Sequence, residues 1–255
     1  REYKIDGFRF DLMALTDRKT IRIAIDKLRK VNPKTIIYGE PWMGGETKLK
    51  LEAQTVWGTQ NETRFALFNS DFRDAIRGDN DGSGRGFVQG NTGSKYGVEK
   101  GLIGSFNYRN MFPNVNKNPI GSINYFCAHD NLIFEDKLQK SVGDIPQIND
   151  MTKLAFGIIL TAEGIPFFHA GNEFRRNKKM CENSYCSPYS LNEIDWRNKE
   201  KHFELFNYVK ELIELRKKHR VFRLEDASEV LEKVTLIDSK NENVIISLCN
   251  NGDEI

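Results

Sequence analysis

The chain has 255 residues, of which 39% are hydrophobic and 29% are charged, and its formal net charge is +2. This length is enough to bury a sizeable core, and the charge balance gives no strongly basic patch for nucleic acid. No apolar run approaches the roughly 20 residues that a membrane-spanning helix needs. The sequence opens on Arg1 without a methionine, so we expect any targeting signal to lie upstream, and localisation stays unknown.

The residue types that commonly bind metals do not form a recognisable metal-binding motif in this sequence. The cysteines are few and scattered, and no Cys-x-x-Cys or His-Cys cluster completes a zinc site, so we expect free thiols. The run Asp79 to Gly84 superficially resembles a calcium loop, but Gly90 stands where the bidentate Glu belongs. We therefore predict a surface turn there, with no metal and no cofactor. The four cysteines are Cys127, Cys181, Cys186 and Cys249.

Three apolar stretches end in acidic residues. In Asp-Gly-Phe-Arg-Phe-Asp, residues 6–11, the alternation predicts a strand with Arg9 and Asp11 on one face. By itself this pair fits a solvated strand surface equally well. A second strand ends at Glu40, because Pro41 cannot extend a ladder, and a third closes on His129 and Asp130. Sites lie at the carboxyl ends of parallel strands, so these side chains are expected to converge.

The remaining elements alternate strand with helix, which predicts a parallel α/β sheet. An amphipathic helix is expected over 199–219, with its buried stripe formed by Phe203, Phe206, Val209, Leu212, Ile213 and Leu215. After residue 222, segments 230–237 and 243–248 predict two strands of a separate all-β unit. The expected strands of the first part are 4–11, 35–40, 64–69, 122–129 and 165–169. The other expected helices are 17–31, 71–77, 96–106 and one capped by Asn149 or Asp150 that runs to Ala162.

The motifs, taken together, resemble the α-amylase family of glycoside hydrolases. Gly7 to Met13, Tyr38 to Trp42 and Ala128 to Asn131 are similar to three of its four signature regions. The resemblance is closest to type I pullulanases, through Tyr-Gly-Glu-Pro-Trp, through Phe-Arg-Asp-Ala-Ile at 72–76 and through segment 183–196. It covers roughly residues 3 to 222. The fourth signature, an Asp and a His, is not found and is expected before Arg1.

The resemblance implies a role for each matching residue. Asp11 would be the nucleophile, Glu40 the general acid and base, and Asp130 the stabiliser of the transition state. We expect the Glu40 carboxyl to keep its proton beside Trp42, while a cationic neighbour keeps Asp11 ionised. The implied substrate-binding residues are Arg9, Trp42, His129, Asn183 and Tyr185, and packing roles for Trp42, Asn183 and Tyr185 are equally open. Cys186 and Tyr189 depart from the family pattern, which leaves the outer subsites in doubt.

The expected architecture is a partial (β/α)8 TIM barrel, strands four to eight, over residues 1–222. Residues 223–255 would begin a C-terminal β-sandwich. The implied function is a retaining hydrolase of α-1,6 branch linkages in pullulan, glycogen or limit dextrins, with an α-glucan as partner and neither nucleic acid nor membrane. An α-1,4 amylase, an isoamylase and a non-catalytic glycan- or partner-binding relative stay open as alternatives, and so does calcium in the intact protein. Because three barrel strands are missing, we expect this chain alone to be inactive.

Overall fold

The computed structural model describes residues 2–3, 5–112, 116–250 and 252. Its main sheet has five strands in the order β1-β2-β3-β4-β5, and every neighbouring pair is parallel. All five predicted strands of the first part are confirmed, although each is shorter than expected, and Lys4 lies outside the described residues. The strands are β1 (Gly7–Phe10), β2 (Ile36–Gly39), β3 (Ala66–Phe68), β4 (Ser122–Asn124) and β5 (Ile165–Pro166).

Two helices follow the first and third strands as the sequence predicts. Helix α1 (Arg18–Val31) starts at Asp17, whose carboxylate accepts a hydrogen bond from the Thr20 amide, and Asn32 ends it. Helix α2 (Ser70–Arg77) starts in the same way at Asn69, which accepts from the Phe72 amide. Such caps satisfy amide groups that have no partner within the helix.

Three helices in the middle of the chain differ from those that the sequence predicts. Helix α3 (Lys95–Leu102) ends before the expected residue 106, because Gly104 turns the chain at a φ of +87°. Helix α5 (Ile148–Thr161) begins after Gln147 and is not capped by Asn149 or Asp150. Helix α4 (Phe134–Val142) was not predicted. It joins α2, α5 and α8 around the largest core cluster, in which Phe126 and Phe156 pack edge to face at 5.0 Å.

The predicted helix over 199–219 is broken at His202 into α7 (Arg197–Lys201) and α8 (Phe203–Lys218). Its expected stripe is only partly right. Val209 is buried, but Phe203 and Leu215 are 59% and 40% exposed, and Leu205 is buried instead. A short helix, α6 (Tyr189–Asn192), lies in the preceding loop.

The last part of the chain contains a helix where a strand was expected. Residues 227–233 form α9 (Ala227–Lys233), so the predicted strand over 230–237 is reduced to β6 (Val234–Ile237). It pairs antiparallel with β7 (Ile246–Cys249). Val230 and Val234 are buried with Phe106 and Tyr108 in one apolar cluster, so this part packs directly on the segment after α3. The division at residue 222 stays a prediction.

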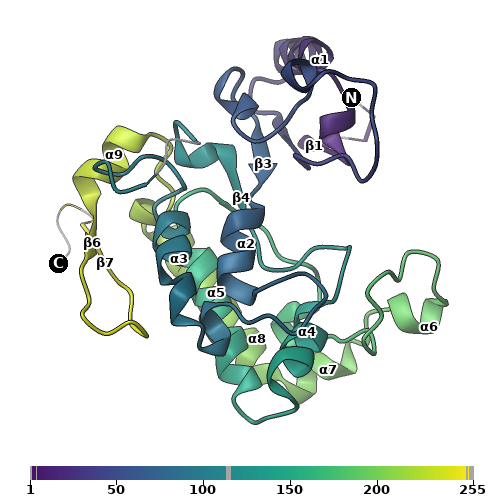
Figure 1. The fold of residues 1–255 in the computed structure, drawn as a ribbon, viewed down its shortest axis with the longest axis vertical. Coiled ribbons are helices and arrows are strands. Elements are labelled where there is room, and N and C mark those ends of the chain that lie inside the picture. Colours follow the sequence, from purple (N-terminus) through teal and green to yellow (C-terminus); the bar gives the residue numbers. More distant parts are fainter. Residues whose placement is uncertain (1, 4, 113–115, 251, 253–255) are drawn as a thin grey trace.

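The ribbon shows how these elements are arranged (Figure 1). Strand β1 and helix α1 stand at one end of the molecule, and β3 leads from there to the body, in which α2, α4, α5 and α8 pack together. Within the described residues, no helix is both long and apolar enough to span a membrane.

Candidate active site

The first two strands bring Arg9, Asp11 and Glu40 to one edge of the sheet. Phe10 pairs with Gly39, and the Glu40 amide donates to the Phe10 carbonyl at 3.1 Å. Gly39 permits this close approach, because a Cβ atom there would lie 2.8 Å from the Phe10 oxygen. Asp11 and Glu40 therefore lie side by side, each at the carboxyl end of one of two adjacent strands.

The Arg9 guanidinium bridges the two carboxylates. Its Nη1 lies 2.6 Å from Asp11 Oδ1, and its Nη2 contacts Glu40 Oε1. The other oxygen of Glu40 accepts a hydrogen bond of 2.8 Å from the Leu12 amide. Leu12 has a φ of +41°, in the left-handed region that non-glycine residues rarely adopt. The turn after β1 thus directs a backbone amide at Glu40.

The two acids stand in different surroundings. The Asp11 side chain is 60% exposed and that of Glu40 only 3%. Burial raises the pKa of the Glu40 carboxyl above its usual value, although the Leu12 amide and Arg9 both act to lower it. The direction of this pKa shift agrees with the expectation that Glu40 keeps its proton, and burial is its largest cause.

His129 and Asp130 approach the same place from β4, but they stand on an irregular segment beyond the strand. His129 Nε2 lies 3.4 Å from Asp130 Oδ1 and 3.9 Å from Asp11 Oδ1, and its Nδ1 lies 3.4 Å from Arg9 Nη2. The three predicted carboxylates therefore belong to one cluster, with Asp130 joined to it through the imidazole.

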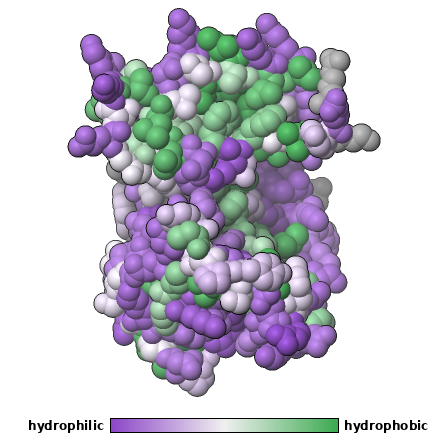
Figure 2. Space-filling view, turned by 90° about the vertical axis from the view of Figure 1, so that its right-hand side faces the viewer, coloured by the Kyte–Doolittle hydropathy of each residue, from purple (hydrophilic) through white to green (hydrophobic). Residues whose placement is uncertain are grey.

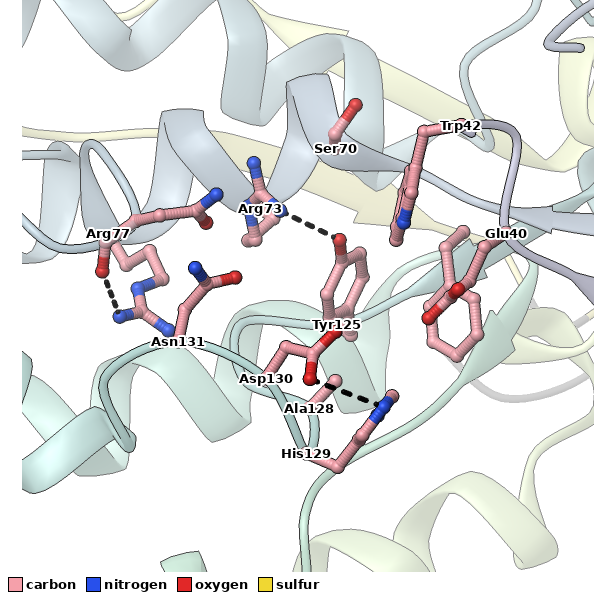
Figure 3. A pocket seen from close by; sticks show the side chains of 12 residues that line it. Glu40, Trp42, Ser70, Arg73, Arg77, Tyr125, Ala128, His129, Asp130 and Asn131 are labelled. Atoms are coloured by element: carbon pink, nitrogen blue, oxygen red, sulfur yellow. Dashed lines mark hydrogen bonds and ion pairs between the residues drawn. The ribbon is translucent and has the colours of Figure 1, made fainter. Parts of the chain in front are cut away.

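A pocket of about 290 Å³ opens beside this cluster. In the close-up, Trp42 and Tyr125 stand over it between Glu40 and Arg73, while His129 and Asp130 close the side opposite Trp42 (Figure 3). Phe68 also lines the pocket, with its ring 4.9 Å from the Tyr125 ring and 5.8 Å from the Arg9 guanidinium. Trp42 also packs on Phe68 at 6.3 Å, so it is both pocket wall and partly buried core.

Two predicted residues lie elsewhere. Asn183 and Tyr185 are exposed in the loop before α6, Tyr185 by 82%, and neither lines the pocket. The sequence analysis missed Tyr125 and Arg73, whose Nη1 donates to the Tyr125 hydroxyl at 3.0 Å. The motif at 72–76 had marked the region of Arg73, but nothing in its pattern indicated that this side chain faces the site.

Asp11, Glu40 and His129 are also the group whose geometry could hold a metal ion within the described ranges, since one ligand atom from each lies within 4.8 Å of the others. Arg9 already supplies a positive charge to both carboxylates.

In the 79–84 loop, whose sequence resembles a calcium site, the positive charge comes from a lysine side chain. Lys137 is fully buried, and its ammonium donates to Asp79 Oδ1 at 2.7 Å and to the Gly82 and Gly84 carbonyls.

The fold and the site define an α/β protein with a carboxylate-lined pocket at the carboxyl edge of a parallel sheet. No family model matches the sequence. Over 247 residues, 92% of this chain, it is 38% identical to "Pullulanase" of Bacillus subtilis (strain 168), and the match spans 33% of that protein. Two solved structures are similar as well. One is a pullulanase from Bacillus acidopullulyticus, with a TM-score of 0.90, 32% identity and coverage of 96% of this chain and 30% of that one.

The other is a pullulanase from Anoxybacillus sp. LM18-11 complexed with maltotriose, with a TM-score of 0.89, 36% identity and coverage of 96% of this chain and 35% of that one. The chain is thus pullulanase-like over almost its entire length, and it spans about a third of the length of these relatives. The resemblance expected from the sequence motifs is confirmed.

Proposed function

We propose that this chain carries the catalytic residues of a retaining glycoside hydrolase that cleaves α-1,6-glucosidic branch linkages in α-glucans such as pullulan, glycogen or limit dextrins. The observation that carries the proposal is the Arg9-bridged pair of acids, one exposed and one buried, at the edge of the pocket. The pullulanase similarity supports the substrate class, and the maltotriose named with the Anoxybacillus structure is an α-glucan oligosaccharide.

The separation of the two acids supports retention of configuration. An oxygen of Asp11 lies within 4.8 Å of one of Glu40. Retaining enzymes hold their carboxyl groups roughly 5 to 5.5 Å apart, whereas inverting enzymes leave about 6.5 to 9.5 Å for a water molecule. In a retaining mechanism Asp11 attacks the anomeric carbon as the bond to the leaving oxygen breaks, and it forms a glycosyl ester.

The environments assign the two roles. The buried Glu40, with its raised pKa, donates its proton to the leaving oxygen and then, as carboxylate, takes a proton from the attacking water. The Arg9 guanidinium lies 2.6 Å from Asp11 Oδ1 and would hold this carboxylate in place for attack. Asp130 and His129 would bind sugar hydroxyls as the ring distorts, and Trp42 would offer an aromatic face. Roles for Asn183 and Tyr185 in sugar binding stay predictions.

We also propose that the five-stranded sheet is part of a (β/α)8 barrel. Within the described residues, β1 and β5 each have a strand partner on one side only. Apolar side chains gather over the end of the molecule that holds β1, where Ile5 and Ile36 are 59% and 51% exposed (Figures 1 and 2). Unpaired edges with exposed apolar residues favour association. We therefore expect the 255-residue chain alone to aggregate and to lack activity.

The test of the function is product analysis with the longer protein that would carry this chain. It should release maltotriose from pullulan and leave linear amylose nearly intact. Rapid breakdown of amylose would point to an α-1,4-acting amylase, release from glycogen without action on pullulan would point to an isoamylase, and glucan binding without any turnover would point to a non-catalytic relative.

A further inference from the structure

The segment that carries His129 and Asp130 is not held by a sheet. Strand β4 ends at Asn124 and helix α4 begins at Phe134, so residues 125–133 have no ladder of backbone hydrogen bonds. Asn131 lies in the left-handed region with a φ of +66°. A segment of this kind needs other contacts to keep two site residues in place.

Those contacts come from the 79–84 loop and the end of α2. Asp81 accepts two hydrogen bonds, from Asn131 Nδ2 at 2.6 Å and from the Leu132 amide at 2.8 Å. Arg77 is buried and donates to the Phe126 carbonyl at 3.0 Å and to the Leu132 carbonyl at 2.8 Å. Hydrogen bonds therefore hold the segment at Phe126, before His129, and at Asn131 and Leu132, directly after Asp130. In the close-up, Asn131 extends from Asp130 toward Arg77, away from Trp42 (Figure 3).

The loop that supplies Asp81 is itself held in place by a buried lysine. The buried Lys137 ammonium binds Asp79, Gly82 and Gly84, two of which flank Asp81 closely in sequence. A charge-assisted bond and two carbonyl bonds to one buried ammonium leave the loop little freedom. Because Lys137 stands on α4, the loop is fixed to the helix that follows the segment.

We propose that Asp81 is a positioning residue, which holds the main chain at Asn131 and Leu132 so that His129 and Asp130 face the pocket. The inference rests on the proposed function of the site. Asp81 does not line the pocket, so it acts through the segment and does not touch substrate. Without Asp81, Arg77 still anchors both ends, and the part between them gains freedom.

The primary test is D81A in the longer protein that would carry this chain, assayed on pullulan. We expect kcat to fall about tenfold or more, because a misplacement of about 1 Å can cost that much, while KM changes by less than about threefold. The matched control is D144A, the same acid-to-alanine change at an exposed position in the turn between α4 and α5, outside both the 79–84 loop and the pocket lining. It should leave kcat within about twofold of wild type. An unchanged kcat in D81A, or an equal loss in D144A, would overturn the proposal.

A double-mutant cycle tests whether Asp81 acts through Asn131. N131G removes the side chain but keeps a residue that accepts the positive φ. If the two side chains act together, N131G should slow the wild type by at least about threefold and slow D81A by much less. Equal effects of N131G in both backgrounds would mean that Asp81 works independently of Asn131, against the proposal.

Hydrogen exchange separates failure of this inference from failure of the proposed function. The Leu132 amide, which loses its hydrogen bond to Asp81, should exchange at least about tenfold faster in D81A, and the amides of α5 should keep their wild-type rates. This comparison needs no substrate. A wild-type protein inert on every glucan would refute the function and still leave exchange to decide the role of Asp81, and unchanged exchange would refute that role.

Discussion

Replacing Glu163 by Gln should make the free energy of unfolding far less dependent on pH. Glu163 is 2% exposed, in the turn between α5 and β5, and it accepts a hydrogen bond of 2.9 Å from the Leu224 amide. The nearby Arg216 donates to the carbonyls of Leu160, Ala162 and Gly164, so it makes no direct bond to this carboxyl. Burial therefore dominates and raises the pKa of Glu163 from 4.5 to about 8.

The sign and size follow from proton linkage. Between pH 4.5 and about 8 the folded chain keeps the Glu163 proton while the unfolded chain has lost it, so stability falls as pH rises. A pKa difference of one corresponds to about 1.4 kcal/mol, which gives at most about 5 kcal/mol over the whole window. Gln keeps an acceptor for Leu224 and has no charge to bury, so its stabilising effect should grow with pH.

Urea unfolding of the longer protein that would carry this chain, at pH 5, 6, 7, 8 and 9, measures this effect. The difference in unfolding free energy between E163Q and wild type should rise by about 3 to 4 kcal/mol from pH 5 to pH 8 and then level off. E232Q, at an exposed position, serves as control and should follow the wild-type curve. Parallel curves for E163Q and wild type would refute the assignment of a buried, protonated carboxyl.

Three further outcomes are expected. R9M should move the basic limb of the kcat/KM profile to higher pH, because loss of the guanidinium raises the pKa of Glu40 further; an unmoved limb would argue against the bridge. K137M should destabilise the fold by about 3 kcal/mol in thermal unfolding, since Asp79 and two carbonyls lose a buried cation, and a change below about 1 kcal/mol would contradict that role. Prolonged dialysis against EDTA should leave the folding of the 79–84 loop unchanged by hydrogen exchange, because Lys137 already fills its centre; a loosened loop would indicate a metal instead.

The ends of the first strands could be predicted from the sequence, because in each case a short apolar run is followed at once by charged residues or by proline. Alternation placed Arg9 and Asp11 on one face, and Pro41 fixed the position of Glu40, so the convergence of these residues followed from parallel pairing alone. The third stretch was read correctly for its position and incorrectly for its backbone. His129 and Asp130 stand on a loop that Asp81 holds through Asn131 and Leu132. A contact between residues about fifty positions apart cannot be predicted from a local sequence pattern.

Helix α4 shows why other parts could not be predicted. Its buried residues include Glu135, Asp136 and Lys137, each satisfied by a distant partner, and these charges interrupt the apolar pattern formed by Phe134, Leu138 and Val142. In α9, Val230 packs against residues after α3, and its β-branched side chain favoured a strand in the sequence. In both cases tertiary contacts outweighed the local preference.

The most direct measurement is to trap the covalent intermediate. In E40Q the base that activates water is lost, but an α-maltotriosyl fluoride needs little acid assistance, so the first step still proceeds. The protein should accumulate a glycosyl ester, and mass spectrometry of its peptic peptides should place the sugar on Asp11. Absence of any adduct while the fluoride is consumed, or an adduct on another carboxylate, would contradict a retaining mechanism with Asp11 as nucleophile.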